Sequence, residues 1–379
     1  MKKITFKNCN KWEKCYLVPF DDENVCGSPV ASRENGKTDE LEFDFDDAEY
    51  IGFYIASDDG NKTGKVYSGN LSLGVEYKYN SKVGRDLTYL YSSDLIKSGR
   101  VENFVLYDDF NLSYREDRSK KISVFIPNSY DGITPHDILY FFDSQNLFCK
   151  AGVYTENGDP YGSWQLDLVI SELHRQHGKN IIVVGIDNSD MYRSRELFMN
   201  SAFFGKLSSF ATDIPDDDFS KGYLEKLSSF MVTTLHSFIK EKYCISDKNI
   251  GIGGSSMGGI ASFFCGLYET GFYKYVLAYS PAFALYEMDA FKNWFSKLSF
   301  RRNIDLLPKI HIYCGGGDEL ERQLLPASQE MKGEMIEQGY PFFKIWETYD
   351  INKQHNEESW RLILPESFSL LLGLFLEDK

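Results

Sequence analysis

The chain has 379 residues and a formal net charge of −15. This length predicts two domains, or one large domain with an appendage. The acidic balance argues against nucleic acid and against an anionic membrane surface as partners, because both attract basic proteins.

The cysteines and the apolar segments indicate the cellular compartment in which the protein is expected to function. Seven cysteines at irregular spacing, without a CxxC pair, argue against a disulfide framework or a zinc site and favour a reducing compartment. No apolar segment of the signal-peptide type follows Met1. The longest strongly apolar run, Leu370–Leu376, is far shorter than the ~20 residues of a membrane span. We therefore expect a soluble, cytoplasmic protein that uses no metal and no other cofactor.

Residues 1–97 carry short alternating segments separated by turn-rich stretches. The segments are Lys3–Lys7, Lys14–Val18, Leu41–Phe45 and Ile51–Ile55. Short strands at regular spacing with turn signals predict a β-sandwich. The first domain is therefore predicted as a small β-sandwich that spans residues 1–97.

Residues 98–379 instead alternate apolar strands with helical patterns. Such alternation predicts a mostly parallel sheet covered by helices on both faces. The predicted strands are Lys121–Pro127, Asp137–Phe142, Asn180–Ile186, Ile250–Gly253, Tyr275–Tyr279 and Lys309–Tyr313. The predicted helices are Trp164–His174, Tyr223–Lys242 and Leu362–Phe375.

The most informative motif is Gly254–Gly258, which reads G-S-S-M-G. It follows a predicted strand and precedes a helical run, as a G-x-S-x-G nucleophile elbow requires. Glycines allow close backbone approach there, and a helix N-terminus favours a developing oxyanion. We therefore predict that Ser256 is the nucleophile of an α/β-hydrolase fold. The alternative is a plain Gly-Ser loop between two elements.

A serine nucleophile needs a base, which follows it in the chain order of α/β-hydrolases. Of the six histidines, only His311 and His355 follow Ser256. His311 lies inside a predicted buried strand, which favours a structural role. His355 lies in a polar loop before the last predicted helix, where an imidazole can reach a serine. We therefore predict His355 as the general base; an exposed loop histidine is the alternative.

The acid of the triad should follow the strand Lys309–Tyr313. Asp318 is the first carboxylate after that strand, and a glycine run before it lets it reach inward. Its role would be to hold the tautomer of His355 and to stabilise the imidazolium. Glu319 and Glu321 compete for this role, and the acidic run can also serve as a helix N-terminus.

An oxyanion hole needs two backbone N–H groups. Met257, the residue after the nucleophile, is expected to supply one of them. The loop after the strand Asp137–Phe142 should supply the other, and Gln145 is the candidate in that loop unless the loop is a simple turn. Trp164 is a further candidate, for substrate binding.

From about Gly99 onward the chain resembles the putative esterase family, which includes enterochelin, feruloyl and acetyl-xylan esterases and, more distantly, esterase D-like enzymes. The segments that carry the resemblance are Lys121–Tyr130, Asp143–Phe148, Val184–Asn188, Gly253–Gly259, Ser280–Phe283 and His355–Trp360.

The resemblance implies the same roles for Ser256, His355 and Met257, and with less force for Asp318, because branches of the family place the acid differently and keep Glu321 open. It also implies that Arg195, beside Glu196, lies near the substrate.

The first domain resembles a starch-binding β-sandwich module, on the pattern of Trp12, Tyr16 and the Phe53-Tyr54 strand. The resemblance implies that aromatic rings stack on sugars. The same rings could instead form the core of the module, or the domain could act as a lid over the catalytic site.

Together these features predict a serine carboxylic-ester hydrolase that works through an acyl-enzyme. The expected substrate is a small ester of an acylated carbohydrate, feruloyl or siderophore type, with a glycan as a possible partner of the first domain. An acyltransferase with the same triad, and a non-catalytic carbohydrate-binding protein on a hydrolase scaffold, are the alternatives.

Overall fold

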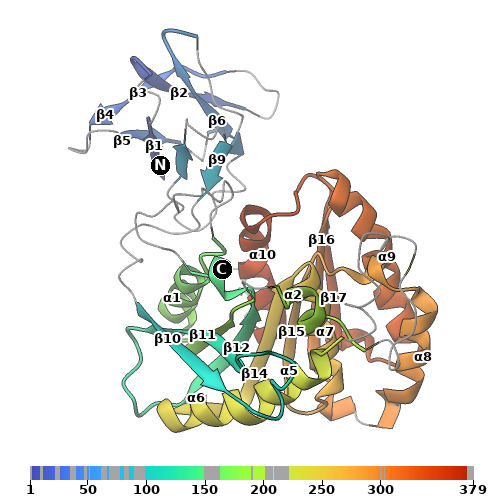
Figure 1. The fold of residues 1–379 in the computed structure, drawn as a ribbon. Coiled ribbons are helices and arrows are strands. Elements are labelled where there is room, and N and C mark those ends of the chain that lie inside the picture. Colours follow the sequence, from blue (N-terminus) through green and yellow to red (C-terminus); the bar gives the residue numbers. More distant parts are fainter. Residues whose placement is uncertain are drawn as a thin grey trace.

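The structure is a computed structural model of the whole chain (Figure 1). The described residues are 2–8, 12–21, 26–34, 40–46, 49–50, 52–60, 66–67, 77–80, 85–88, 99–148, 163–188, 191–200, 208, 222–298, 300–302 and 304–373.

An eight-stranded sheet forms the larger part, in the order β10-β11-β13-β12-β14-β15-β16-β17. β11 pairs antiparallel with both β10 and β13, and the other neighbours pair in parallel. The strands are β10 (Gly99–Tyr107), β11 (Ser119–Pro127), β12 (His136–Phe142), β13 (Ile181–Ile186), β14 (Ile245–Ser255), β15 (Tyr275–Tyr279), β16 (Lys309–Gly315) and β17 (Ile345–Asp350). The carboxyl ends of β12 to β17 therefore share one edge of the sheet, where α/β proteins place their sites.

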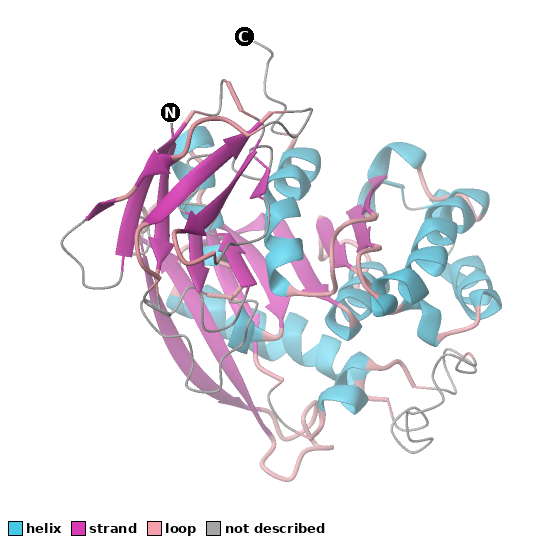
Figure 2. Cartoon of the chain, turned by 90° about the horizontal axis from the view of Figure 1, so that it is seen from above, coloured by secondary structure: helices cyan, strands magenta, loops and turns pink. Residues whose placement is uncertain are grey.

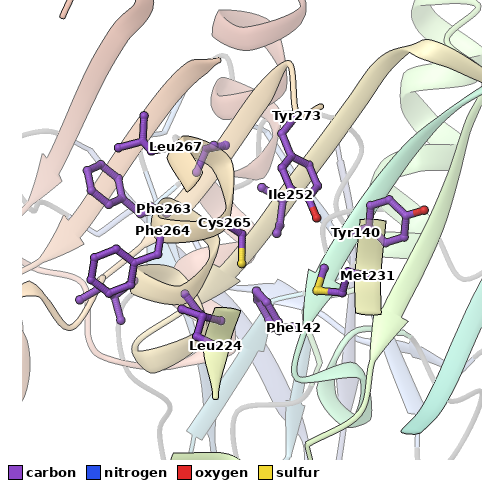
Figure 3. Packing of buried hydrophobic residues seen from close by; sticks show 14 of the residues in the cluster. Tyr140, Phe142, Leu224, Met231, Ile252, Phe263, Phe264, Cys265, Leu267 and Tyr273 are labelled. Carbon is purple, nitrogen blue, oxygen red and sulfur yellow. The ribbon is translucent and has the colours of Figure 1, made fainter. Parts of the chain in front are cut away.

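Both faces of this sheet are buried, because successive side chains of a strand point to opposite faces. In β12, Tyr140 and Phe142 belong to one apolar cluster, and Leu139 and Phe141 belong to the other. Figure 3 shows the first cluster, in which Tyr140 and Phe142 lie with residues of the neighbouring helices.

Helices contribute residues to each cluster. Figure 2 shows the helices lying beside the strands. The first cluster includes residues of α5 (Leu224–Phe230), α6 (His236–Lys242), α7 (Met257–Tyr268), α8 (Met288–Leu298) and α9 (Glu319–Glu337). The second includes residues of α1 (Leu166–His177) and α10 (Glu357–Leu372). The predicted α/β-hydrolase-like core with a mostly parallel sheet is confirmed.

The N-terminal strands form two smaller sheets, in the orders β4-β5-β1-β8-β9 and β3-β2-β6-β7. The strands are β1 (Lys2–Lys7), β2 (Cys15–Phe20), β3 (Val30–Ala31), β4 (Arg33–Glu34), β5 (Glu40–Phe45), β6 (Gly52–Ser57), β7 (Val66–Tyr67), β8 (Tyr77–Asn80) and β9 (Arg85–Thr88). Both sheets contribute to one apolar cluster, with Phe6 and Phe43 from one and Leu17 and Phe53 from the other. Phe53 therefore belongs to the core of this part, and Trp12 packs against Phe6 at 5.5 Å between ring centroids.

Several elements extend or interrupt the predicted ones. The predicted helix Tyr223–Lys242 consists of α5, a π-helical turn (Met231–Leu235) and α6. The last helix begins at Glu357, five residues before the predicted start, because Asn356 caps it by accepting the Ser359 N–H at 2.9 Å. Among the described residues, no helix is long and apolar enough to cross a membrane.

Candidate active site

Ser256 lies at a sharp turn between β14 and α7. Its φ is 56° and its ψ is −120°, a strained backbone conformation for a residue other than glycine. The backbone on both sides fixes the turn, because the Ser256 N–H donates to Tyr279 O at 2.9 Å and the Ser256 carbonyl accepts from Ile260 and Ala282. The half-buried serine therefore sits at the N-terminus of α7 in the geometry of a nucleophile elbow.

The glycines of the motif are required by close backbone approach. A Cβ on Gly254 would lie 2.5 Å from the carbonyl oxygen of Gly258, and one on Gly259 would lie 2.7 Å from Tyr279 O. Neither contact is with a flexible side chain, so a larger residue would displace the backbone of the turn.

His355 follows β17 and directly precedes α10. Its backbone N–H donates to Asp318 Oδ2 at 2.7 Å, and its Nδ1 lies 3.1 Å from Glu321 Oε1. The ring also meets the edge of Trp360, with 5.0 Å between centroids. Three contacts therefore hold this loop histidine in one orientation.

Glu321 is completely buried, and hydrogen-bond donors surround its carboxylate. Oε1 accepts from Ser280 Oγ and faces His355 Nδ1, and Oε2 accepts from the Gly315 N–H at 2.9 Å and the Cys314 thiol at 3.1 Å. Burial raises the pKa of Glu321, but the hydrogen bonds and the nearby imidazole outweigh it, so the pKa lies below its ordinary value. The carboxylate is therefore ionised at neutral pH.

The structure places Asp318 differently from the sequence prediction. Its Oδ1 accepts the Glu321 N–H at 2.9 Å, which makes Asp318 the N-cap of α9, and its Oδ2 accepts the His355 backbone N–H. Both oxygens of Asp318 are thus occupied by backbone donors, and the carboxylate at the imidazole is that of Glu321. Of the three acids that the sequence left open, Glu321 has the geometry of a triad member.

The two oxyanion candidates follow two adjacent strands, β12 and β14. Met257 is the first residue of α7, so its N–H has no acceptor within the helix. Gln145 lies in the short 3-10 turn Ser144–Asn146 after β12, and its Nε2 donates to Asn188 Oδ1 at 2.7 Å. The oxyanion role of both residues stays a prediction.

Arg193 joins these two segments, and the sequence prediction missed it. Its guanidinium donates to both oxygens of Asp143 at 3.2 Å and lies 3.5 Å from Met257 Sδ. Asp143 precedes the 3-10 turn and adopts a positive φ of 64°. The predicted Arg195 lies two residues further along α2 (Arg193–Leu197), and its carbonyl accepts the Tyr223 N–H. The substrate-binding role of Arg195 stays a prediction, and the guanidinium beside Met257 is that of Arg193.

The structure does not support Trp164 as a substrate contact. The side chain is 1% exposed, and its ring packs between Phe141, Tyr279 and Trp360 at centroid distances of 4.9, 4.9 and 5.4 Å. A large apolar ring gains more from this burial than from a solvent-facing position, and it is inaccessible to a ligand.

Within the part of the chain that the structure describes, no group of three His, Cys, Asp or Glu residues could hold a metal ion.

A strand-to-helix serine elbow, an imidazole after the last strand and a buried carboxylate on that imidazole define the α/β-hydrolase class of site. The model of the family described as "Putative esterase" matches residues 113–369, and the chain belongs to this family. No curated protein matches the sequence.

Solved structures with the same fold have low sequence identity. An IroE-like serine hydrolase from Shewanella oneidensis has a TM-score of 0.56 at 12% identity, over 73% of this chain and 82% of that chain. The siderophore hydrolase EstA from Aspergillus nidulans scores 0.53 at 12% identity, over 72% and 94%. A mutant of the feruloyl esterase module from Clostridium thermocellum, complexed with sinapinate, scores 0.50 at 12% identity, over 76% and 94%.

Proposed function

We propose that the protein is a serine carboxylic-ester hydrolase with Ser256 as nucleophile, His355 as base and Glu321 as acid. The observation that carries this proposal is the contact between His355 Nδ1 and the buried carboxylate of Glu321, at the same edge of the sheet as the Ser256 elbow. A carboxylate on Nδ1 leaves Nε2 as the proton acceptor for a serine hydroxyl.

In the proposed reaction, Ser256 Oγ attacks the ester carbonyl and its proton passes to His355 Nε2. The Met257 and Gln145 N–H groups stabilise the oxyanion, and the imidazolium is stabilised by Glu321. The imidazolium then protonates the departing alcohol as the acyl-enzyme forms. Water attacks the acyl-enzyme by the same route in reverse, which releases the acid and restores Ser256.

The proposal is tested with p-nitrophenyl acetate on the full chain and on Ser256→Ala. We expect the variant to lose nearly all activity while its melting temperature stays close to that of the wild type. Ser171→Ala is a matched control, because this buried serine on α1 donates to the Asp167 carbonyl in its own helix. Equal rates for wild type and Ser256→Ala would sink the proposal.

The substrate class we propose is a small ester of the siderophore, feruloyl or acylated-carbohydrate type. Its support is the esterase family and the fold shared with a siderophore hydrolase and a feruloyl esterase module. Hydrolysis of a feruloyl ester, a trilactone and an acetylated sugar, compared as kcat/KM, separates the three.

Acyl transfer by the same triad is distinguished by product analysis with an added alcohol acceptor. If wild type and Ser256→Ala are both inactive on every ester, a non-catalytic glycan-binding role for the N-terminal strands is tested by binding of starch to the full chain. The cytoplasmic location stays a prediction and is tested by fractionation of cells.

A further inference from the structure

Ser280 and Trp360 are buried, and hydrogen bonds connect them to Glu321. Ser280 follows β15, is completely buried and donates from Oγ to Glu321 Oε1. Trp360, on the first turn of α10, donates from Nε1 to Ser280 Oγ at 2.9 Å. A chain of hydrogen bonds therefore runs from the indole of Trp360 through Ser280 to the carboxylate at His355.

The direction of this chain follows from the chemistry of a hydroxyl. Serine has one proton to donate, and its oxygen also accepts. Because the indole N–H can only donate, it occupies an acceptor position of Ser280 Oγ. The single hydroxyl proton is then free to point at Glu321 Oε1, the same oxygen that faces His355.

The backbone holds Ser280 in an unusual conformation for this contact. Its φ is 39°, which is rare for a residue other than glycine, and its N–H donates to Tyr313 O on β16. Strained residues of this kind persist where the surroundings fix them, and they cluster at functional sites.

Trp360 also contacts the site directly, through its indole ring. The indole packs face to face on Trp164, at 5.4 Å between centroids and 21° between planes, and it meets the His355 ring edge-on. Trp360 is 4% exposed, and its backbone N–H donates to Asn356 O in the first turn of α10. One rigid side chain therefore contacts the imidazole directly and the carboxylate through Ser280.

We propose that Ser280 and Trp360 are positioning residues that hold the Glu321 carboxylate against His355 during the reaction. This inference rests on the proposed function, since it assigns a role within the same triad. A glutamate side chain has several rotatable bonds, and only fixed donors keep its carboxylate in one plane. Neither Ser280 nor Trp360 is assigned a contact with the reacting atoms.

The test compares Ser280→Ala, Trp360→Phe and the double variant in the full chain. Ser280→Ala removes the donor, and Trp360→Phe keeps an aromatic ring but removes the N–H. We expect Ser280→Ala to lower kcat by about 3- to 10-fold, the effect of one hydrogen bond, with KM within about twofold. Trp360→Phe should lower kcat less, because the Ser280 hydroxyl remains but can turn away.

The double variant should be no slower than Ser280→Ala, because Trp360→Phe acts through the hydroxyl that is already missing. A spectroscopic readout is the imidazole Nδ1–H proton resonance of His355, which should shift or broaden in both single variants. Ser171→Ala and Trp294→Phe are matched controls, since these residues are buried in α1 and α8 and should leave the resonance unchanged.

Wild-type kcat and an unchanged resonance in both single variants would overturn the inference, as would kcat losses that multiply in the double variant. Should Ser280→Ala fail to fold, the resonance and kcat of Trp360→Phe decide alone. Failure of the proposed function has a different signature, in which Ser256→Ala hydrolyses the ester as fast as the wild type.

Discussion

Two glutamates, Glu196 and Glu321, have no exposed surface at all, yet their surroundings differ. Glu196 on α2 pairs with two permanent cations, Arg115 Nη1 at 2.9 Å and Lys120 Nζ, and both cations are buried with it. Tyr114 adds a hydrogen bond at 3.0 Å. This group fastens α2 to β11 and to the turn before it.

Glu321 has neutral donors in place of these cations. A hydroxyl, a thiol, a backbone N–H and the His355 ring satisfy its oxygens. Of these partners only the imidazole can become positively charged. The comparison shows that the charge of Glu196 is neutralised by two cations, so this carboxylate serves the fold. The carboxylate of Glu321 is satisfied by hydrogen bonds without being neutralised, so it can stabilise a charge that forms on His355.

The largest effect is expected from Glu321→Gln, which removes the charge of the carboxylate proposed to act in catalysis. Glutamine keeps the size of the side chain but loses the charge that stabilises the imidazolium, so kcat/KM for p-nitrophenyl acetate should fall about 10³- to 10⁴-fold. Steady-state kinetics on folded protein measure this. A loss smaller than tenfold, combined with a large loss in Asp318→Asn, would restore Asp318 as the triad acid.

The second effect concerns stability, at the structural glutamate. Glu196→Gln leaves Arg115 and Lys120 buried without their counter-charge, which should lower the free energy of unfolding by about 3–5 kcal/mol. Urea denaturation measures it. The control is Glu172→Gln on α1, whose partner Arg175 is largely exposed, so this change should cost at most ~1 kcal/mol. Equal losses in the two variants would contradict a special role of the buried group.

Most of the fold and two of the three residues of the proposed triad could be predicted from the sequence. Apolar runs flanked by turns located the central strands, and the glycines around Ser256 and the polar loop around His355 are local signals. The choice between Asp318 and Glu321 was less clear, because both acids lie within one helical turn. The D-x-x-E spacing is a helix-start signal and could have marked Asp318 as the N-cap of α9.

Ser280, Trp360 and Arg193 could not be found in this way. Ser280 and Trp360 are 80 residues apart in the chain, and only the pairing of β15 with β16 and the return of α10 bring them to Glu321. Arg193 and Arg195 lie two residues apart in a five-residue helix, so they differ in the direction in which their side chains leave it. Such contacts depend on tertiary packing, which local periodicity does not encode.

The third prediction uses pH to separate the contribution of Glu321 to the free energy of unfolding from that of His311. His311 is buried between Ser367 and Thr348, and burial lowers its pKa to about 4. The unfolded chain binds this proton already near the ordinary value of about 6.5, so stability is full above pH ~6.5 and falls by about 3 kcal/mol as pH decreases to about 4. His311→Gln should flatten the stability curve in this window.

The pKa of Glu321 is also lowered, so its contribution to stability is lost in the same direction, as pH falls, but in a lower pH window. It is fully present above the ordinary carboxyl range and is lost as pH falls through the lowered value. Glu321→Gln should therefore change the slope of the stability curve below pH ~4.5, and above that range it should lower the curve by a constant amount. Urea denaturation of both variants between neutral and acid pH measures this, and an unchanged slope below pH ~4.5 in Glu321→Gln would contradict the assignment.

The smallest effect is expected from Asp318→Asn, and it decides which role the Asp318 carboxylate has. Asparagine keeps one oxygen to cap α9, but its amide cannot accept the second backbone N–H, that of His355. Loss of one such hydrogen bond should cost about 1 kcal/mol of stability and reduce kcat less than tenfold. Thermal unfolding and kinetics on the same preparation measure both quantities. A stability loss without a matching catalytic loss fits a residue that orients the His355 loop, whereas a kcat loss as large as that of Glu321→Gln would mean that the charge of Asp318 acts on the imidazolium.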